Sequence, residues 1–179
     1  MKKKIILISL FMLCFILTGC SLNNTPKAKV ETLLMKYQKN SDSVMSELDD
    51  YLNTLNIKDD AHEEYKKVYT KQYSDLTYNI KDEMIDGDTA TVTTQIEVYD
   101  YYKIDNDATK YVSDNPDKFS TNNVYDSKKV LEYKIDKLTN AKDRVTYSVV
   151  FNLTKVDNEW KVDNLSNEDL EKIHGIYAH

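Results

Sequence analysis

The apolar residues of this chain change their spacing near residue 75, and this change limits its possible folds more than any other feature. Before that point they recur at intervals of three and four, as along one face of an α-helix (Val30, Leu33, Leu34 and Tyr37). After it they alternate with polar residues, as along a β-strand that buries one side (Val145, Tyr147, Val149, Phe151 and Leu153). A chain that is first helical and then mostly stranded predicts the α+β class.

Turn signals divide the chain into shorter segments. Asp86-Gly87 predicts a hairpin turn between two strands. Residues 103–125 are polar and contain Asn115-Pro116, which predicts an irregular or short-helical insertion. The expected helices cover residues 26–37, 44–55, 60–73, 126–138 and 166–175, and the expected strands cover residues 76–80, 91–98, 145–153 and 160–162.

The first nineteen residues have the layout of a secretory signal peptide. Three lysines precede thirteen uncharged residues, Ile5 to Leu17, and the small pair Thr18-Gly19 follows. This apolar run is shorter than the roughly 20 residues that a membrane-spanning helix needs. We therefore expect residues 1–19 to be removed.

The end of this segment, Leu17-Thr18-Gly19-Cys20, resembles the bacterial lipobox. The resemblance implies that the Cys20 thiol receives a diacylglyceryl group and that a signal peptidase cuts the Gly19–Cys20 bond. Two acyl chains anchor a protein stably, so Cys20 is expected to hold the mature chain at the outer face of the bacterial cytoplasmic membrane. The alternative is an ordinary signal peptide with a chance cysteine.

The mature chain is expected to be acidic and to form one domain. Residues 20–25 supply the lipidated cysteine and a short spacer, and residues 26–179 have the length of a single domain. Loss of three leader lysines lowers the net charge from −6 to about −9. This acidity excludes nucleic acid as a partner, because a phosphate backbone needs a basic stripe. Cys14 leaves with the leader, so we expect no disulfide.

The sequence contains no recognisable motif for catalysis or metal binding. The histidines, His62, His174 and His179, lack ligand spacing, and His174 is placed where a protonated imidazole suits the end of a helix. Only Gly87 and Gly175 remain after the leader, too few for a phosphate-binding loop or a nucleophile elbow. The acidic residues do not match a calcium loop. We expect no catalytic residue, no metal and no cofactor.

Tyrosine is unusually frequent, with 14 residues. Helical spacing of Tyr65, Tyr69 and Tyr73 favours core packing, and the candidates for a pocket or contact surface are Tyr99, Asp100, Tyr101 and Tyr147. Strand alternation predicts that Tyr99 and Tyr101 are exposed and that Asp100 shares the core-facing side. Asp100 is then either a buried carboxylate suited to act as a general base, or a residue outside the core that is solvated or caps nearby backbone amides.

The order of elements resembles the NTF2-like superfamily. The stretches DLTYNIKDEMIDGDTATVTTQIEVYDYYK and DRVTYSVVFNLTKVDNEWKVDNLSNEDLEKIHGIY are similar to those of uncharacterised NTF2-like lipoproteins from low-GC Gram-positive bacteria. The resemblance implies a cone, in which a strongly curved, mainly antiparallel sheet wraps around the N-terminal helices. It implies a fold and not a reaction, because it brings no catalytic motif.

Two functions agree with these features. The first is a non-catalytic binding or interaction module of the cell envelope, whose partner is an envelope protein or a small apolar ligand. The second is an enzyme of the ketosteroid-isomerase or SnoaL-like type acting on a small apolar substrate, which needs a carboxylate and a tyrosine inside the cone. Its carboxylate candidates, Asp82, Asp100 and Asp163, all lie near strand ends.

We predict that Cys20→Ala abolishes membrane retention and blocks cleavage before residue 20, because the thiol is the acceptor of the lipid. Metabolic labelling with a fatty-acid analogue, followed by membrane fractionation, measures both effects. Ser21→Ala is the matched control and should be labelled and retained. Label that persists on the Cys20→Ala protein would contradict the lipoprotein prediction.

Overall fold

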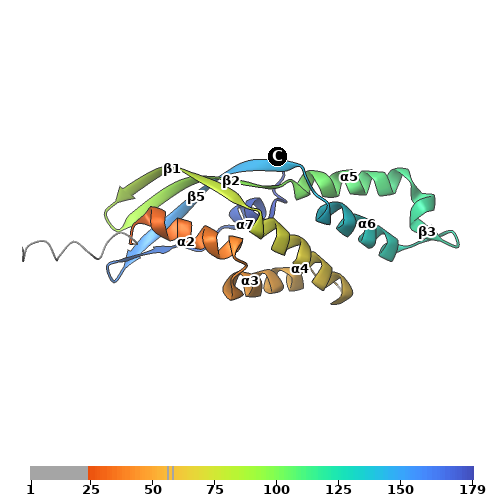
Figure 1. The fold of residues 1–179 in the computed structure, drawn as a ribbon, viewed down its shortest axis with the longest axis horizontal. Coiled ribbons are helices and arrows are strands. Elements are labelled where there is room, and N and C mark those ends of the chain that lie inside the picture. The colour runs from red at the N-terminus through yellow and green to blue at the C-terminus, as the bar shows by residue number, and fades with distance from the viewer. Residues whose placement is uncertain (1–23, 56, 58) are drawn as a thin grey trace, which may run out of the picture.

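The fold of the chain belongs to the α+β class, as predicted. A computed structural model describes residues 24–55, 57 and 59–179, so Gly19 and Cys20 lie outside the described residues. The described part contains six α-helices and a four-stranded antiparallel sheet that does not close on itself (Figure 1). None of its helices is both long and apolar enough to cross a membrane.

The helices and strands follow one another in nearly the predicted order. The helices are α2 (Pro26–Gln38), α3 (Asp42–Thr54), α4 (Asp59–Ser74), α5 (Tyr101–Asp114), α6 (Ser127–Thr139) and α7 (Asn167–His174), with a short 3-10 helix η2 (Pro116–Phe119). The strands are β1 (Thr77–Asp86), β2 (Thr89–Tyr99), β3 (Ser120–Thr121), β4 (Val124–Tyr125), β5 (Arg144–Val156) and β6 (Glu159–Val162).

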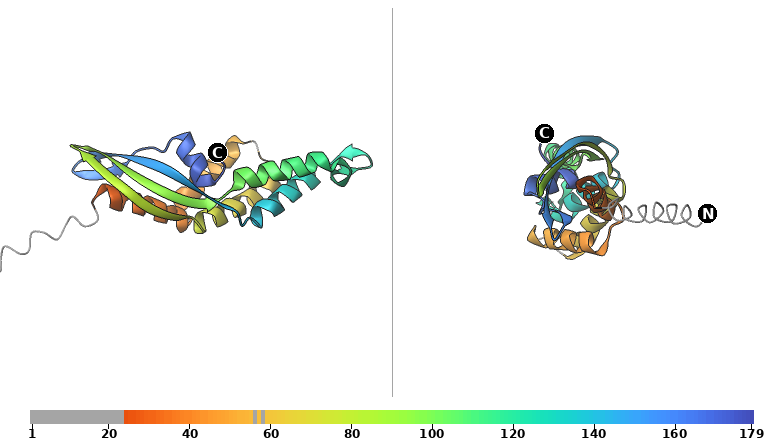
Figure 2. Two further views of the ribbon diagram at one scale, coloured as in Figure 1. Left: turned by 90° about the horizontal axis from the view of Figure 1, so that it is seen from above. Right: turned by 90° about the vertical axis from the view of Figure 1, so that its left-hand side faces the viewer.

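The main sheet has the strand order β1-β2-β5-β6, and every neighbouring pair is antiparallel. β2 pairs with β5 along its whole length, from Thr89 opposite Thr154 to Tyr99 opposite Arg144. The alternation seen in the sequence is confirmed, because one face of these strands is buried and the other is largely exposed. α2 packs against the buried face and lies within the curve of the sheet (Figure 2).

The segment predicted as an irregular or short-helical insertion, residues 103–125, is more regular than expected and contains a longer helix. Most of it is the 14-residue helix α5, followed by η2 and the β3–β4 hairpin. α5 packs along α6, and the two helices project beyond the end of the sheet (Figures 1 and 2). Its apolar stripe is narrow because a single neighbouring helix covers it, and Tyr111 stacks on Tyr133 of α6 at 5.2 Å between ring centroids. The many polar residues on the rest of α5 hid its periodicity.

A fully buried glutamine of α4 links this helix to the ends of β2 and α7 through hydrogen bonds. The Gln72 amide of α4 donates to the carbonyl oxygens of Tyr99 and His174 at 3.0 and 2.8 Å, and its oxygen accepts from the Tyr99 N–H at 2.8 Å. α7 is bounded as predicted, with a capping box between Ser166 and Asp169 and with Gly175 at φ +74°. Gly175 touches the Gln72 amide and the Tyr99 carbonyl so closely that a Cβ would overlap both.

We predict that Gly175→Ala lowers the free energy of unfolding by about 3–4 kcal/mol, because it combines a left-handed backbone with an overlap that buried backbone cannot relieve. Gly87→Ala is the matched control, since Gly87 also has a positive φ of +60° but meets nothing within 4 Å. It should cost only about 1 kcal/mol. Urea denaturation of both variants measures the difference, and equal losses would contradict the packing of Gly175.

Candidate functional site

The four residues predicted as a site lie where the sheet meets α5. The rings of Tyr99 and Tyr101 stack, with their centroids 6.0 Å apart. Tyr99 is half-buried and donates to Asp75, whereas Tyr101 is 1% exposed and donates to the Val68 carbonyl. The predicted exposure of Tyr101 is therefore wrong. The strand ends at Tyr99, so strand alternation no longer applies to the first residue of α5.

Both hypotheses about Asp100, burial in the core and capping of backbone amides, are correct in part. Its side chain is 5% exposed, and it caps α5 by accepting from the Lys103 N–H at 2.9 Å. Its second oxygen lies 3.4 Å from His179 Nε2. The carboxylate is thus buried, as strand alternation predicted. It also accepts a backbone hydrogen bond, as the capping alternative predicted.

Tyr147 faces the C-terminal segment of the chain. Its hydroxyl donates to the Tyr177 carbonyl at 2.9 Å and lies 3.4 Å from His179 Nδ1. Burial, together with the nearby Asp100 charge, raises the pKa of Tyr147 to about 12, so the hydroxyl stays protonated. Neither Tyr147 nor the other three predicted residues lines the cavity described next.

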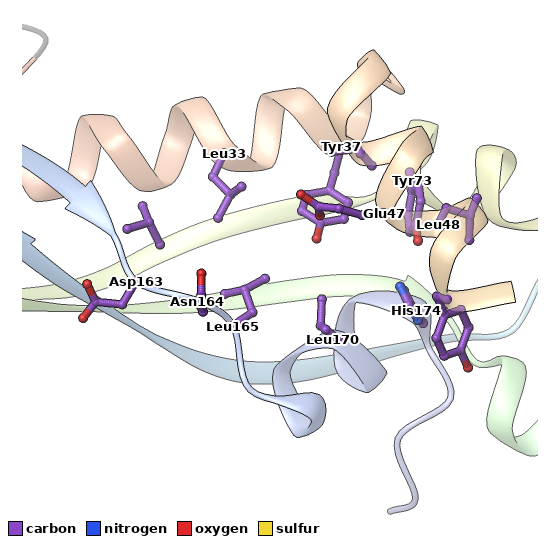
Figure 3. A pocket seen from close by; sticks show the side chains of 13 residues that line it. Leu33, Tyr37, Glu47, Leu48, Tyr73, Asp163, Asn164, Leu165, Leu170 and His174 are labelled. Atoms are coloured by element: carbon purple, nitrogen blue, oxygen red, sulfur yellow. The ribbon is translucent and has the colours of Figure 1, made fainter. Parts of the chain in front are cut away.

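A cavity of about 400 Å³ lies between α2, α3 and the segment from β6 to α7. Figure 3 shows its lining side chains in a row, from Asp163 and Asn164 at one end to His174 and Tyr73 at the other. The first two are exposed and the last two are buried, so the cavity is open at one end and enclosed at the other. The walls between are mainly apolar (Leu33, Val44, Leu48, Val162, Leu165 and Leu170).

An aromatic cluster forms the enclosed end. The His174 ring lies 4.7 Å from Tyr51, 5.2 Å from Tyr69 and 5.8 Å from Tyr73, measured between centroids. Tyr37 meets Tyr73 edge to face at 5.2 Å. Burial is the main cause that raises the pKa values of Tyr37 and Tyr73 well above the ordinary tyrosine value. The Glu47 charge adds to it for Tyr37, and Tyr37, Tyr51 and then Glu47 add to it for Tyr73. These phenols offer hydroxyl groups to a bound molecule and no negative charge.

His174 is the functional candidate that sequence reasoning missed. The sequence placed it in the last turn of a helix as a protonatable group, but its side chain is 5% exposed and burial lowers its pKa to about 4. Its Nδ1 has no hydrogen-bond partner among the described residues. A buried polar atom without a partner costs about 1–3 kcal/mol, so a ligand that reaches it would recover part of that cost.

Two carboxylates line the cavity, and both are exposed. Asp163 lies at its open end and Glu47 lies beside Tyr37 (Figure 3), and among the described residues no carboxylate is buried beside His174. Within residues 24–55, 57 and 59–179, no three His, Cys, Asp or Glu side chains approach one another closely enough to hold a metal ion. The arrangement can bind a molecule with an apolar body and a hydrogen-bonding group, since apolar walls with few polar contacts are typical of ligand sites.

No protein-family model matches the chain, and no curated protein matches it. Among solved structures, a similar chain is a protein of Bacillus subtilis subsp. subtilis str. 168 named "putative lipoprotein (ycdA)", with 15% identity and a TM-score of 0.47 over 75% of this chain. The match covers 45% of that protein, so this chain spans less than half of its length.

We predict that the free energy of unfolding falls by about 2–3 kcal/mol, through His174 alone, as the pH is lowered from 6.5 to 4. The folded-state pKa lies below the unfolded value of 6.5, so in this window the unfolded chain binds a proton that the folded chain excludes. Stability is retained above about pH 6.5 and lost as the pH falls toward 4.

Urea denaturation of the wild type and of His174→Phe at pH 7 and pH 4.5 isolates this effect, because the titration of other groups is common to both proteins. The wild type should lose more stability between the two pH values than the variant. The same loss in both would show that His174 is protonated in the folded state.

Proposed function

We propose that the chain is a lipid-anchored protein of the bacterial cell envelope that binds a small, mainly apolar molecule and does not transform it. The cavity between α2, α3 and α7 is the binding site, and Cys20 carries the anchor. The observation that carries the proposal is the buried His174 ring, which lines an apolar cavity and has an Nδ1 without a partner in the described chain. The lipobox resemblance at residues 17–20 supports the location.

The surroundings of the cavity define the chemistry of the ligand. Its enclosed end contains neutral tyrosines and a neutral imidazole, and its lining includes Glu47 and Asp163. An anionic ligand would meet the like charges of Glu47 and Asp163, and none of the described residues that line the cavity is a lysine or arginine. The ligand is therefore not an anion, and it places an apolar body against Leu33, Leu165 and Leu170 and one hydrogen-bonding group at His174.

Binding is supported over isomerase-type catalysis by the positions of the acids. A general base must reach the bound molecule within hydrogen-bonding distance. Asp100 caps α5 outside the cavity, and Glu47 and Asp163 line the cavity but are exposed. The NTF2-like relationship belongs to the same proposal, and its support is the open curved sheet that encloses α2 together with the two quoted stretches.

We predict that the neutral fluorescent probe N-phenyl-1-naphthylamine binds in this cavity and that Leu165→Trp abolishes binding by filling it. Leu131→Trp is the matched control, because Leu131 is a leucine of similar burial that lines a different groove, between α4 and α6. Fluorescence titration should show binding to the wild type and the control alone. Binding that survives Leu165→Trp and is lost in Leu131→Trp would place the site in the other groove.

A further inference from the structure

The N-terminal end of the described chain is fixed to one end of the sheet. The Asn24 amide donates to the Asn158 carbonyl at 2.9 Å, and its oxygen accepts from the Trp160 N–H at 3.0 Å. Three residues later the Lys27 N–H donates to Glu83 of β1 at 2.8 Å. Asn24 thus lies at the sheet end that holds the β1–β2 turn at Gly87-Asp88 and the β5–β6 turn at Asp157-Asn158. We name this end of the molecule the anchor end.

The anchor end is close to Cys20 along the chain. Asn24 follows Cys20 by four residues, which span at most about 14 Å even when fully extended. A lipid on Cys20 therefore brings the anchor end to within about that distance of the bilayer. The opposite end of the molecule, where α5 and α6 carry the β3–β4 hairpin, lies far from Asn24 along the longest axis (Figures 1 and 2).

We propose that the anchor end is the surface that faces the lipid bilayer, and that the α5–α6 pair projects away from the membrane. The proposal rests on the lipidation of Cys20 proposed above. The short spacer sets the orientation, because Asn24 is bonded to the β5–β6 hairpin and Lys27, three residues later, is bonded to β1, so this segment cannot turn independently of the sheet.

The side chains at the anchor end are suited to contact with lipid headgroups that carry no net charge. Met84 and Ile85, close to the β1–β2 turn, are 64% and 54% exposed, and Val156 is exposed near the β5–β6 turn. The carboxylates at this end outnumber its lysines, so it is repelled by anionic lipids (Asp82, Glu83, Asp86, Asp88, Asp157 and Glu159 against Lys27, Lys81, Lys155 and Lys161). The anchor end should therefore contact zwitterionic lipid more strongly than anionic lipid. The lipid on Cys20, and not electrostatic attraction, keeps it at the bilayer.

The orientation sets the height of the other parts of the molecule. β2 and α5 follow one another along the longest axis, so the β3–β4 hairpin stands about 55 Å from the anchor end. Val124 and Tyr125 of this hairpin are 67% and 65% exposed. α2 is about 20 Å long and begins at the anchor end, which holds Tyr37 and the candidate cavity above the lipid surface.

Single cysteines with a fluorescent label test this orientation, since the mature chain contains no other free thiol. The sites are Met84→Cys near the anchor end, Val150→Cys in the middle of β5 and Val124→Cys on the β3–β4 hairpin, all of them exposed. Each lipidated mature variant, residues 20–179, is reconstituted into phosphatidylcholine vesicles that contain a lipid with a nitroxide on its headgroup. We expect quenching to be strongest at position 84, weaker at 150 and absent at 124.

Two controls separate this proposal from the proposed function. A long Gly/Ser insertion after Ser21 should keep the protein on the vesicles and remove the order of quenching, because the spacer no longer limits the distance. Equal quenching at all three sites, or strongest quenching at 124, in protein that sediments with vesicles would overturn the orientation alone. Failure of the mature protein to sediment with vesicles would overturn the anchor, and the orientation with it.

Discussion

The buried amide of Gln72 is the contact on which the candidate site depends. It satisfies two backbone groups of Tyr99 at the end of β2 and the carbonyl of His174 at the end of α7. Each of these groups is costly to leave unpaired in the interior, at about 1–3 kcal/mol. One side chain of α4 therefore fixes both the point at which the sheet gives way to α5 and the position of the histidine in the cavity. Gly175 lies against the same amide because only a residue without a Cβ fits there.

The polar groups of the interior differ in how completely they are paired. Tyr101, Tyr147 and Asp100 each reach a backbone group, so they stabilise the junction between sheet and helices. His174 lies in equally dry surroundings, yet its Nδ1 has no partner in the described chain. The presence or absence of a hydrogen-bond partner therefore distinguishes the two candidate sites. The first is the group of four residues predicted from the sequence, and the second is the cavity that we propose as the binding site. His174 Nδ1 is itself buried, so a ligand gains this hydrogen bond only where the surrounding rings move to admit it, whereas a paired group offers no such gain.

The elongated shape gives the two ends of the molecule different surroundings once the chain is anchored. The end nearest Cys20 carries both hairpin turns of the sheet, and the other end carries a hairpin with two exposed apolar side chains. The cavity lies between them, beside α2. In the proposed orientation α2 starts at the anchor end and runs along the sheet, so its length would determine how far from the lipid surface a ligand binds.

The sequence by itself determined most of the secondary structure, because the signals for it are local. Thr25 and Asp126 cap the helices expected at residues 26–37 and 126–138, the Asp86-Gly87 turn joins β1 to β2, and Ser166 and Gly175 bound α7. Alternation along β2 and β5 correctly identified the buried face of the sheet. The lipobox at Cys20 lies outside the described residues and stays a prediction.

Tertiary structure decided what local patterns do not contain. The length of α5 was hidden because one neighbouring helix covers only a narrow stripe of it. Tyr101 is buried because β2 ends at Tyr99, two residues before the position to which strand alternation was extended. The state of His174 depended on Tyr51, Tyr69 and Tyr73, which lie more than 100 residues away in the sequence. The desolvation of His174 comes from these distant neighbours. The sequence alone therefore predicted a protonated imidazole at a helix end, whereas the imidazole is neutral in the folded protein.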